Sequence, residues 1–371
     1  MASTLTEAHG PASSTVGDPS LGWLRYLAEV VPLQYFADPS QALSAAANRW
    51  NERHRSWHGP AHLTDLVDRI VRIEMGHARE VLLLAALFHD VVYDPTSSTN
   101  EEESAEYLLR AVVDPQQPAV REAADIILAS KWTRQPPGEL ARRFFALDTR
   151  QLGSEVTLAE RLAYERAIFR EYQWVPWPVY REKRGKFLKG WAVQFPEHKQ
   201  GVAECLQLLE ALAPRVAVYP GSFNPFHLGH LSVLRQAEQS FDKVIVAVGI
   251  NRQKAGSAEA MEQRHDALRA QLKFHEVRAF DGLLSEFIDQ LGHPVSVVRG
   301  VRDGTDLEAE LRFARFLGEL RPRTSVVWIG CEPEYQHLSS SAIRELESFR
   351  PGAGSRYVPA APAIYNYSPG C

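Results

Sequence analysis

The sequence predicts a multidomain chain, in which an all-α domain is followed by an α/β domain with a doubly wound parallel sheet. Three observations carry this prediction. The 371 residues exceed one ordinary domain of about 150 residues. Apolar residues recur at helical spacing early in the chain, whereas short β-branched runs alternate with helical stretches after Pro214. We expect domains at 21–212 and 213–371, behind a flexible tail at 1–20 that is rich in Ser, Thr, Pro, Gly and Ala.

The first domain is expected to consist of helices alone. Apolar side chains follow helical spacing in residues 81–88 and 159–169, and β-branched runs are few. Turns between helices are indicated by Pro and Gly at residues 94–95, 114–115, 136–138 and 175–178.

The second domain is expected to alternate strands and helices. Its β-branched runs predict strands at residues 215–219, 243–249, 276–280, 294–300 and 324–330. The stretches between them predict helices at residues 231–240, 258–272, 283–291 and 307–320. Such a series favours a parallel sheet with right-handed crossovers, whose ligand site lies at the carboxyl ends of the strands.

Composition and charge favour an enzyme of small metabolites. The formal net charge of -5 gives no general attraction to nucleic acid or to an anionic membrane, and no stretch of about 18 apolar residues occurs. The three cysteines form no C-x-x-C pair, which is typical of a reducing compartment. We therefore expect a cytoplasmic protein with small-molecule substrates and with no nucleic-acid or membrane partner.

Residues 219–230, YPGSFNPFHLGH, place two histidines at the end of the first predicted strand. Gly221 permits a tight turn, and Gly229 and His230 open the next helix, whose free N–H groups favour a phosphate. Neither G-x-x-x-x-G-K-[ST] nor G-x-G-x-x-G follows a strand, so other donors must hold the phosphates. Candidates at other strand ends are Lys254, Arg299, Arg302 and the triplet Ser339, Ser340 and Ser341. A serine triplet before a helix also serves as a simple cap, which is the alternative interpretation.

These blocks resemble those of the nucleotidyltransferase superfamily. HLGH is similar to its [HT]-x-G-H signature, and LSSSAIRE is similar to I-S-S-[ST]-x-x-R. The finer resemblance is to bacterial phosphopantetheine adenylyltransferase, through YPGSFNPFHLGH, FDGLLSEF, VRGVRDGTDLEAEL and EPEYQHLSSSAIREL, in that order over residues 215–359. In that family a phosphomonoester attacks the α-phosphorus of ATP, and pyrophosphate leaves.

The resemblance implies a Rossmann-like nucleotidyltransferase domain and a role for each matching residue. His230, Lys254 and Arg299 would be catalytic, because they would stabilise charge on the reacting phosphates. ATP, carrying Mg²⁺, and the acceptor phosphate would be bound by Ser222, Phe223, His227, Arg302, Glu310, Ser339, Ser340 and Ser341. Such a site is rich in His, Lys, Arg and Ser and poor in carboxylates.

Three positions depart from the family pattern. Asn224 replaces an Asp, Ala309 replaces a Tyr, and His227 stands where Thr is frequent. His227 makes the signature H-x-G-H, as in nicotinamide mononucleotide adenylyltransferases and cytidylyltransferases. The acceptor therefore stays open between 4'-phosphopantetheine, which would give dephospho-coenzyme A, and another phosphomonoester such as a pyridine mononucleotide or the substrate of a cytidylyltransferase.

Histidines also gather in the first half of the chain, before and within an apolar helix. They are His54, His58, His62, His77 and the pair His89-Asp90. Because His58 and His62 are four residues apart, we expect them to share one helical face. Because the pair His89-Asp90 lies beside buried surface, it must find hydrogen-bonding partners or bind a metal. A core histidine with its hydrogen bonds made within the protein is the alternative interpretation.

This arrangement resembles the HD phosphohydrolase superfamily, in which His, His-Asp and a distant Asp bind divalent ions. The matching blocks, in order over residues 50–188, are RSWHGPAH, FHDVVYDP, NEEESAEYL, ALDTRQLG, FREY and RGKFL. The resemblance implies the metal ligands His62, His89, Asp90 and Asp148, with His58 as a further ligand or a support, and the auxiliary residues Glu101, Lys131 and Arg184. Mixed nitrogen and oxygen ligands suit Mn²⁺ or Fe²⁺. Ala146 in place of an Asp, and Trp132 near a frequent His, favour one metal ion over two.

Together the two resemblances imply a bifunctional enzyme, in which an HD-type phosphohydrolase is fused to an adenylyltransferase. Two alternatives remain. The transferase could use another acceptor, or one of the two domains could be a non-catalytic nucleotide sensor or scaffold. The resemblance also allows a homo-oligomer, but no residue pattern determines the number of copies.

Overall fold

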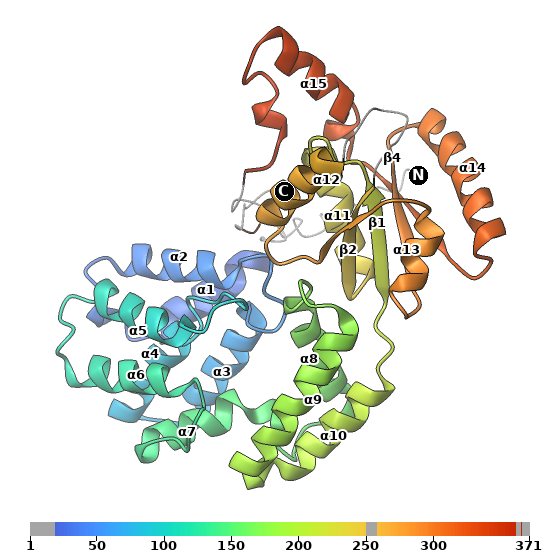
Figure 1. The fold of residues 1–371 in the computed structure, drawn as a ribbon. Coiled ribbons are helices and arrows are strands. Elements are labelled where there is room, and N and C mark those ends of the chain that lie inside the picture. The colour runs from blue at the N-terminus through green and yellow to red at the C-terminus, as the bar shows by residue number, and fades with distance from the viewer. Residues whose placement is uncertain (1–18, 250–257, 361–364, 366–371) are drawn as a thin grey trace, which may run out of the picture.

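The computed structural model describes residues 19–249, 258–360 and 365, and it contains a helical region followed by an α/β region (Figure 1). The helices of the first region are α1 (Pro19–Val30), α2 (Pro39–Trp50), α3 (Pro60–Ile73), α4 (Gly76–Phe88), α5 (Asn100–Ala111), α6 (Pro118–Ala129), α7 (Gly138–Asp148), α8 (Leu158–Glu171), α9 (Trp177–Gln194) and α10 (Lys199–Ala211). The second region contains β1 (Val216–Gly221), α11 (Leu228–Ser240), β2 (Lys243–Gly249), α12 (Ala258–Gln271), β3 (Val277–Phe280), α13 (Leu284–Gln290), β4 (Ser296–Val301), α14 (Gly304–Leu320), β5 (Val326–Gly330) and α15 (Ser340–Phe349). This order confirms the fold classes expected for the two regions.

The helical region is organised around α4. Residues 81–88 of this helix are all buried, and such an apolar helix must be covered on every side. Helices α3 and α6 lie against it, while α8, α9 and α10 form a second group beside them (Figure 1). The end of α4 therefore places His89 at a buried position. Across the part of the chain that the structure describes, no helix is long and apolar enough to cross a bilayer.

The α/β region is a five-stranded parallel sheet in the order β3-β2-β1-β4-β5. Helices cover both faces, because Leu231 of α11 and Leu268 of α12 belong to one apolar cluster, whereas Phe287 of α13 and Leu317 of α14 belong to another. Strands β2 and β3 are added in turn on one side of β1, and β4 and β5 are then added on its other side. The carboxyl ends of β1 and β4 are therefore the switch point, where ligands bind in such sheets.

The main differences from the sequence expectations concern where helices begin. Helix α15 begins at Ser340, because the Ser339 hydroxyl accepts the Ala342 N–H at 3.1 Å and caps the helix. Helix α3 begins at Pro60, a residue type favoured in the first turn. His58 consequently lies in the loop before α3, and the prediction that it shares a helical face with His62 is wrong.

The two regions are joined by a buried polar contact at the start of β2. The Asp242 carboxylate accepts hydrogen bonds from Arg166 and from Arg170 of α8. The next residue, Lys243, is fully buried, and its ammonium donates to the backbone oxygens of Gln173 and Val175, the latter at 2.9 Å. Burial lowers the pKa of Lys243 to about 8. The sheet is thus fastened to the C-terminal end of α8 by opposite charges on adjacent residues.

Candidate active sites

A cavity of about 260 Å³ lies at the switch point of the sheet. Its lining comes from the ends of β1 and β4, the start of α11 and the start of α15, which contribute Gly221, Arg299, His230 and Ser339. A side chain at Gly221 would place its Cβ 2.7 Å from the ring of Phe223. Glycine is therefore required where the chain leaves β1 and turns around that ring.

Two stacked histidines, His227 and His230, stand at the start of α11 with their ring centroids 3.6 Å apart. The backbone N–H of His227 donates to Nδ1 of His230 at 3.2 Å, so a neutral His230 ring carries its proton on Nε2. Burial, together with the positive charge of Arg302, lowers the pKa of His227 to about 4 and lowers the pKa of His230 well below 6.5. Both rings are neutral at pH 7, and His230 offers an N–H donor to a phosphate oxygen.

The depressed pKa of His227 predicts a loss of stability in acid. Below pH 6.5 the unfolded chain takes up a proton on this ring, whereas the folded chain does so only near pH 4. The free energy of unfolding should therefore fall by about 2.5 kcal/mol between pH 7 and pH 4.5 through this group. Urea unfolding at a series of pH values should show a smaller fall for His227→Thr. Equal falls in both proteins would contradict the prediction.

Two guanidinium groups in the same cavity have carboxylate partners. Arg299 donates through Nε and Nη2 to the two carboxylate oxygens of Glu310, each at 2.6 Å. Arg302 pairs in the same way with Asp306, at 2.6 and 2.9 Å. Such two-pronged pairs fix the orientation of the planar groups. The expectation of a site poor in carboxylates is wrong for the described residues, because two carboxylates balance the two arginines.

Most of the residues expected at the transferase site line this cavity. They are Phe223, His227, His230, Arg299, Arg302, Glu310, Ser339 and Ser340. Ser222 and Ser341 do not line it: Ser222 is exposed on the adjoining turn, and the exposed Ser341 hydroxyl accepts from Arg344 at 3.2 Å. Lys254 lies outside the described residues. Asp306 was not expected, although its position four residues after Arg302 on a helix start is a signal for such a pair.

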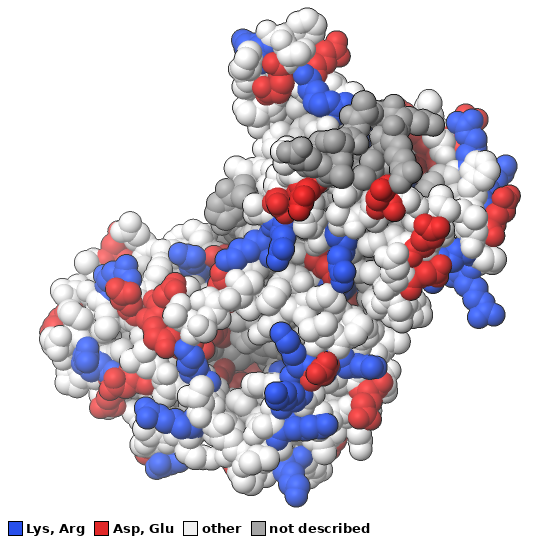
Figure 2. Space-filling view, viewed as in Figure 1, with Lys and Arg blue, Asp and Glu red and all other residues white. Residues whose placement is uncertain are grey.

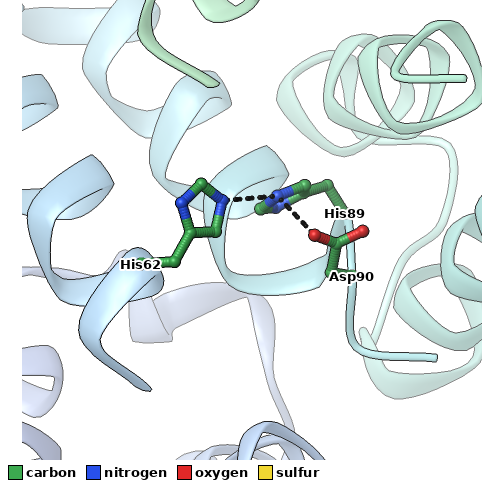
Figure 3. A group of neighbouring side chains, drawn as sticks. All are labelled: His62, His89 and Asp90. Atoms are coloured by element: carbon green, nitrogen blue, oxygen red, sulfur yellow. Dashed lines mark hydrogen bonds and ion pairs between the residues drawn. The ribbon is translucent and has the colours of Figure 1, made fainter. Parts of the chain in front are cut away.

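A second group of side chains converges at the end of α4. The ligand atoms of His62, His89 and Asp90 all lie within 4.8 Å of one another, and the three side chains point toward a common centre (Figure 3). Nε2 of His62 is 3.4 Å from Nε2 of His89, which is 3.1 Å from the Asp90 carboxylate. One oxygen of Asp148 lies 3.3 Å from His62 and 3.5 Å from His89. Two imidazoles and two carboxylates thus surround one point.

The neighbours of these four residues hold them in a ligand geometry. Nδ1 of His89 is 3.0 Å from the backbone oxygen of Ala86, which leaves Nε2 free to act as a ligand. The indole N–H of Trp132 donates to the second oxygen of Asp148 at 2.8 Å. Although burial opposes it, the carboxylates of Asp90 and Asp148 raise the pKa of His89 well above its usual value. The negative charge of these carboxylates favours a proton on the ring, and for the same reason it favours a divalent cation at this point. The residues therefore fit a metal ion.

Each of the two cavities contains a residue in a strained backbone conformation. Among the residues that the structure describes, the two non-glycine residues with positive φ are Phe223, at 43°, and Trp132, at 47°. Phe223 lines the cavity of the sheet, and Trp132 lines the cavity beside His89. This conformation costs about 1 to 3 kcal/mol for a non-glycine residue and persists where the surroundings enforce it.

The cavity beside His89 has a volume of about 570 Å³, and its walls combine aromatic side chains with charged and polar ones. Figure 2 shows a hollow on this face of the helical region, with Lys and Arg side chains gathered over α9 beside it. Glu101, Lys131 and Arg184 all line the cavity, as does His58. Lys131 donates to Glu102 at 2.9 Å, and Arg184 donates to Glu165 at 2.8 and 3.1 Å. Both cations therefore have carboxylate partners.

The loop before α3 is held by a carboxylate that was not expected. Glu171 is 1% exposed, and one of its oxygens accepts the backbone N–H groups of Ser56, Trp57 and His58 at 2.6 to 2.8 Å. Its other oxygen accepts the Tyr93 hydroxyl at 2.7 Å and faces Nδ1 of His58 at 2.6 Å. His58 is thereby committed to Glu171 and does not belong to the cluster of ligand atoms. The FREY block contains Glu171, and that block was the available signal.

Replacing Glu171 should destabilise the helical region strongly. Glu171→Ala leaves four donors and a buried imidazole without their acceptor, so we expect a loss of about 3 to 5 kcal/mol in the free energy of unfolding. Urea unfolding measures this loss, with Glu182→Ala on the exposed surface of α9 as the control. Equal stability of the two variants would contradict the assigned role of Glu171.

Similarity to known proteins identifies the α/β region, with its switch-point cavity, as a nucleotidyltransferase domain. Residues 218–346 match the cytidylyltransferase-like family. The phosphopantetheine adenylyltransferase of Clostridium perfringens is 39% identical over 147 residues, which cover 39% of this chain and 88% of that protein. The same enzyme of Clostridium botulinum is 34% identical over 138 residues, covering 36% of this chain and 83% of the relative. Through its C-terminal domain, the chain belongs to the phosphopantetheine adenylyltransferase family.

A comparison with solved structures finds a match from Francisella tularensis. It is a bifunctional NMN adenylyltransferase/ADP ribose pyrophosphatase, with 14% sequence identity and a TM-score of 0.31. The match covers 42% of this chain and 47% of that chain, so the chain spans about half the length of this neighbour.

Proposed function

We propose that the C-terminal domain transfers the adenylyl group of ATP to 4'-phosphopantetheine, forming dephospho-coenzyme A and pyrophosphate. The observation that carries this proposal is the convergence of His230, Arg302 and Ser339 on one cavity at the switch point. Membership of the adenylyltransferase family supports the choice of ATP and of this acceptor.

In this reaction an oxygen of the acceptor phosphate attacks the α-phosphorus of ATP. The bond from the α-phosphorus to the bridging oxygen breaks, and pyrophosphate leaves with its electron pair. The attacking oxygen is already anionic at pH 7, so no strong general base is required. Catalysis then depends on positioning and on the stabilisation of negative charge.

The described residues supply donors for that purpose. The neutral His230 ring donates its Nε2–H to an oxygen of the α-phosphate, and its orientation is set in advance by the bond from the His227 backbone. Arg302 and the start of α15, capped by Ser339, bind the other phosphates of ATP. Mg²⁺ accompanies ATP as its counter-ion. Arg299, oriented by Glu310, holds the acceptor phosphate. The family motif assigns Lys254, which lies outside the described residues, to the stabilisation of the reacting phosphorus.

His227 favours a second candidate for the acceptor. It gives the signature H-x-G-H, which also occurs in enzymes that act on pyridine mononucleotides or use CTP. A pyrophosphate-release screen separates the candidates, with 4'-phosphopantetheine and nicotinamide mononucleotide as acceptors and ATP or CTP as donors. Release with ATP and 4'-phosphopantetheine alone supports the main proposal. Nucleotide binding without release from any pair would indicate a sensor.

We further propose that the helical domain is an HD-type metal-dependent phosphohydrolase. His62, His89, Asp90 and Asp148 would hold one Mn²⁺ or Fe²⁺, since their donor atoms surround one buried point. A bound divalent ion supplies Lewis acidity and activates water toward a phosphoester. Glu101 lines the same cavity and would orient the water, while Lys131 and Arg184 contribute positive charge around the phosphate.

The test of this activity is phosphate release from a panel of phosphomonoesters in the presence of Mn²⁺. Release by the wild type that disappears in Asp90→Ala supports the hydrolase. Tight Mn²⁺ binding without release from any phosphomonoester would favour a domain that binds its ligand and no longer turns it over.

A further inference from the structure

The loop that carries Asp90 is held by a guanidinium group from the segment before α3. Arg55 is 9% exposed, and its Nη1 donates to the backbone oxygen of Asp90 at 2.6 Å. The same nitrogen donates to the backbone oxygen of His58 at 3.2 Å, and Nη2 donates to that of Val91 at 3.1 Å. Three carbonyl groups around the ligand cluster are thus bound by one buried cation. These hydrogen bonds restrain the backbone at Asp90.

The neighbouring residue, His54, holds the same loop a few residues further on. Its Nε2 is 2.8 Å from the backbone oxygen of Tyr93, so Nε2 carries the proton and donates it. The His54 side chain is 6% exposed, and its ring stacks on Phe274 with 4.3 Å between centroids. Phe274 belongs to the C-terminal domain, in the segment after α12 that reaches the helical domain (Figure 1). His54 therefore touches the metal-site loop on one side and the transferase domain on the other.

Tyr365 completes this wall from the C-terminal domain. Its ring meets His54 edge-on at 5.9 Å, and its backbone oxygen accepts the N–H of Arg53 at 2.9 Å. Its hydroxyl accepts the N–H of Phe274 at 3.1 Å, so the two aromatic residues are fixed to each other. The adjacent Lys273 forms an ion pair with Asp94, at the end of the same metal-site loop. Consecutive residues of the transferase domain thus contact both segments that shape the metal site.

We propose that His54 is a positioning residue of the metal site and that Phe274 and Tyr365 of the transferase domain hold it in place. This inference rests on the proposed metal site. Metal binding needs its donor atoms within about 0.5 Å of their productive positions, and residues behind the ligands typically change metal affinity 10- to 100-fold. By this proposal, the affinity of the helical domain for its metal ion depends on contacts with the transferase domain, although all four ligands come from the helical domain.

The experiment measures Mn²⁺ binding to the full-length chain by the loss of the electron paramagnetic resonance signal of free Mn²⁺. Phe274→Ala removes the stacking wall, and His54→Phe keeps the ring but removes the bond to the Tyr93 oxygen. We expect each variant to bind Mn²⁺ about tenfold more weakly than the wild type. Phe274→Trp restores a stacking surface and should bind within about twofold of the wild type. Phe349→Ala, at a ring that is 79% exposed, is the matched control.

The outcomes separate this inference from the proposed hydrolase. Mn²⁺ binding that is lost in Asp90→Ala is assigned to the proposed metal site. Melting followed by circular dichroism shows whether each variant is folded. Folded Phe274→Ala and His54→Phe variants that bind Mn²⁺ as tightly as the wild type overturn the positioning role alone. A wild type that binds no Mn²⁺ overturns both the metal site and this inference. If Phe274→Ala does not fold, His54→Phe decides the question.

Discussion

Replacing His230 by alanine is expected to lower the rate of pyrophosphate release by about 100- to 1,000-fold. The neutral ring is a donor whose direction is set before substrate binds, because the His227 N–H occupies Nδ1 and leaves the proton on Nε2. Removing one such donor to a developing anion costs about 2.7 to 4 kcal/mol in comparable sites. The value of kcat should carry most of this loss, since the bond strengthens as charge builds on the phosphate.

The measurement is steady-state pyrophosphate release with ATP and the acceptor found in the screen. His293→Ala is the matched control, because His293 precedes β4 at the amino end of the sheet, away from the switch point. Its rate should stay within about twofold of the wild type. If His230→Ala retains more than about a tenth of the wild-type kcat, the donor role is wrong, since the expected loss is at least 100-fold. A loss confined to KM would indicate ground-state binding.

Replacing Asp90 by asparagine should remove metal binding from the helical domain and with it any phosphate release. Asparagine keeps the shape of the side chain but removes the charge that faces His89 at 3.1 Å. The substitution removes one of the two anionic ligands in the set of four. We therefore expect Mn²⁺ affinity and phosphate release each to fall at least about 100-fold. Asp65→Asn, at an exposed ion pair on α3, is the control.

Thermal unfolding gives a measure of this prediction that does not depend on turnover. A ligand at about 100 times its Kd stabilises the folded state by about 2.7 kcal/mol. Mn²⁺ should therefore raise the melting temperature of the wild type and of Asp65→Asn, but not that of Asp90→Asn. An equal rise in all three proteins would assign the ion to some other site.

The fold was largely predictable because its signals are local. Each predicted strand overlaps an observed one, since β-branched runs between turn residues suit a buried parallel strand whatever surrounds them. The gathering of His230, Arg299 and Ser339 follows from the same pattern, because parallel strands end at one edge of the sheet. Local signals failed at helix starts, where Pro60 and the capping Ser339 each set the first helical residue at a position that differs from the expected one by about two residues.

The partners of the site residues were less predictable because they come from distant parts of the chain. Glu171 lies 113 residues after His58, and no spacing rule connects a carboxylate to a loop so far away. The Arg299–Glu310 pair spans only 11 residues, yet it requires knowing that α14 folds back along β4. The sequence alone therefore does not tell which charged side chains already have a partner, because the tertiary structure decides this.

The contact at Asp242 and Lys243 limits how freely the two domains could be exchanged in evolution or by engineering. A transferase domain cut out near residue 213 would expose an ammonium group adapted to the carbonyl groups of its neighbour, while Arg166 and Arg170 would face solvent without their counter-charge. Recombination that replaces one domain would have to bring matching residues for the other. A stand-alone transferase domain would therefore need replacements for Asp242 and Lys243 at the start of β2.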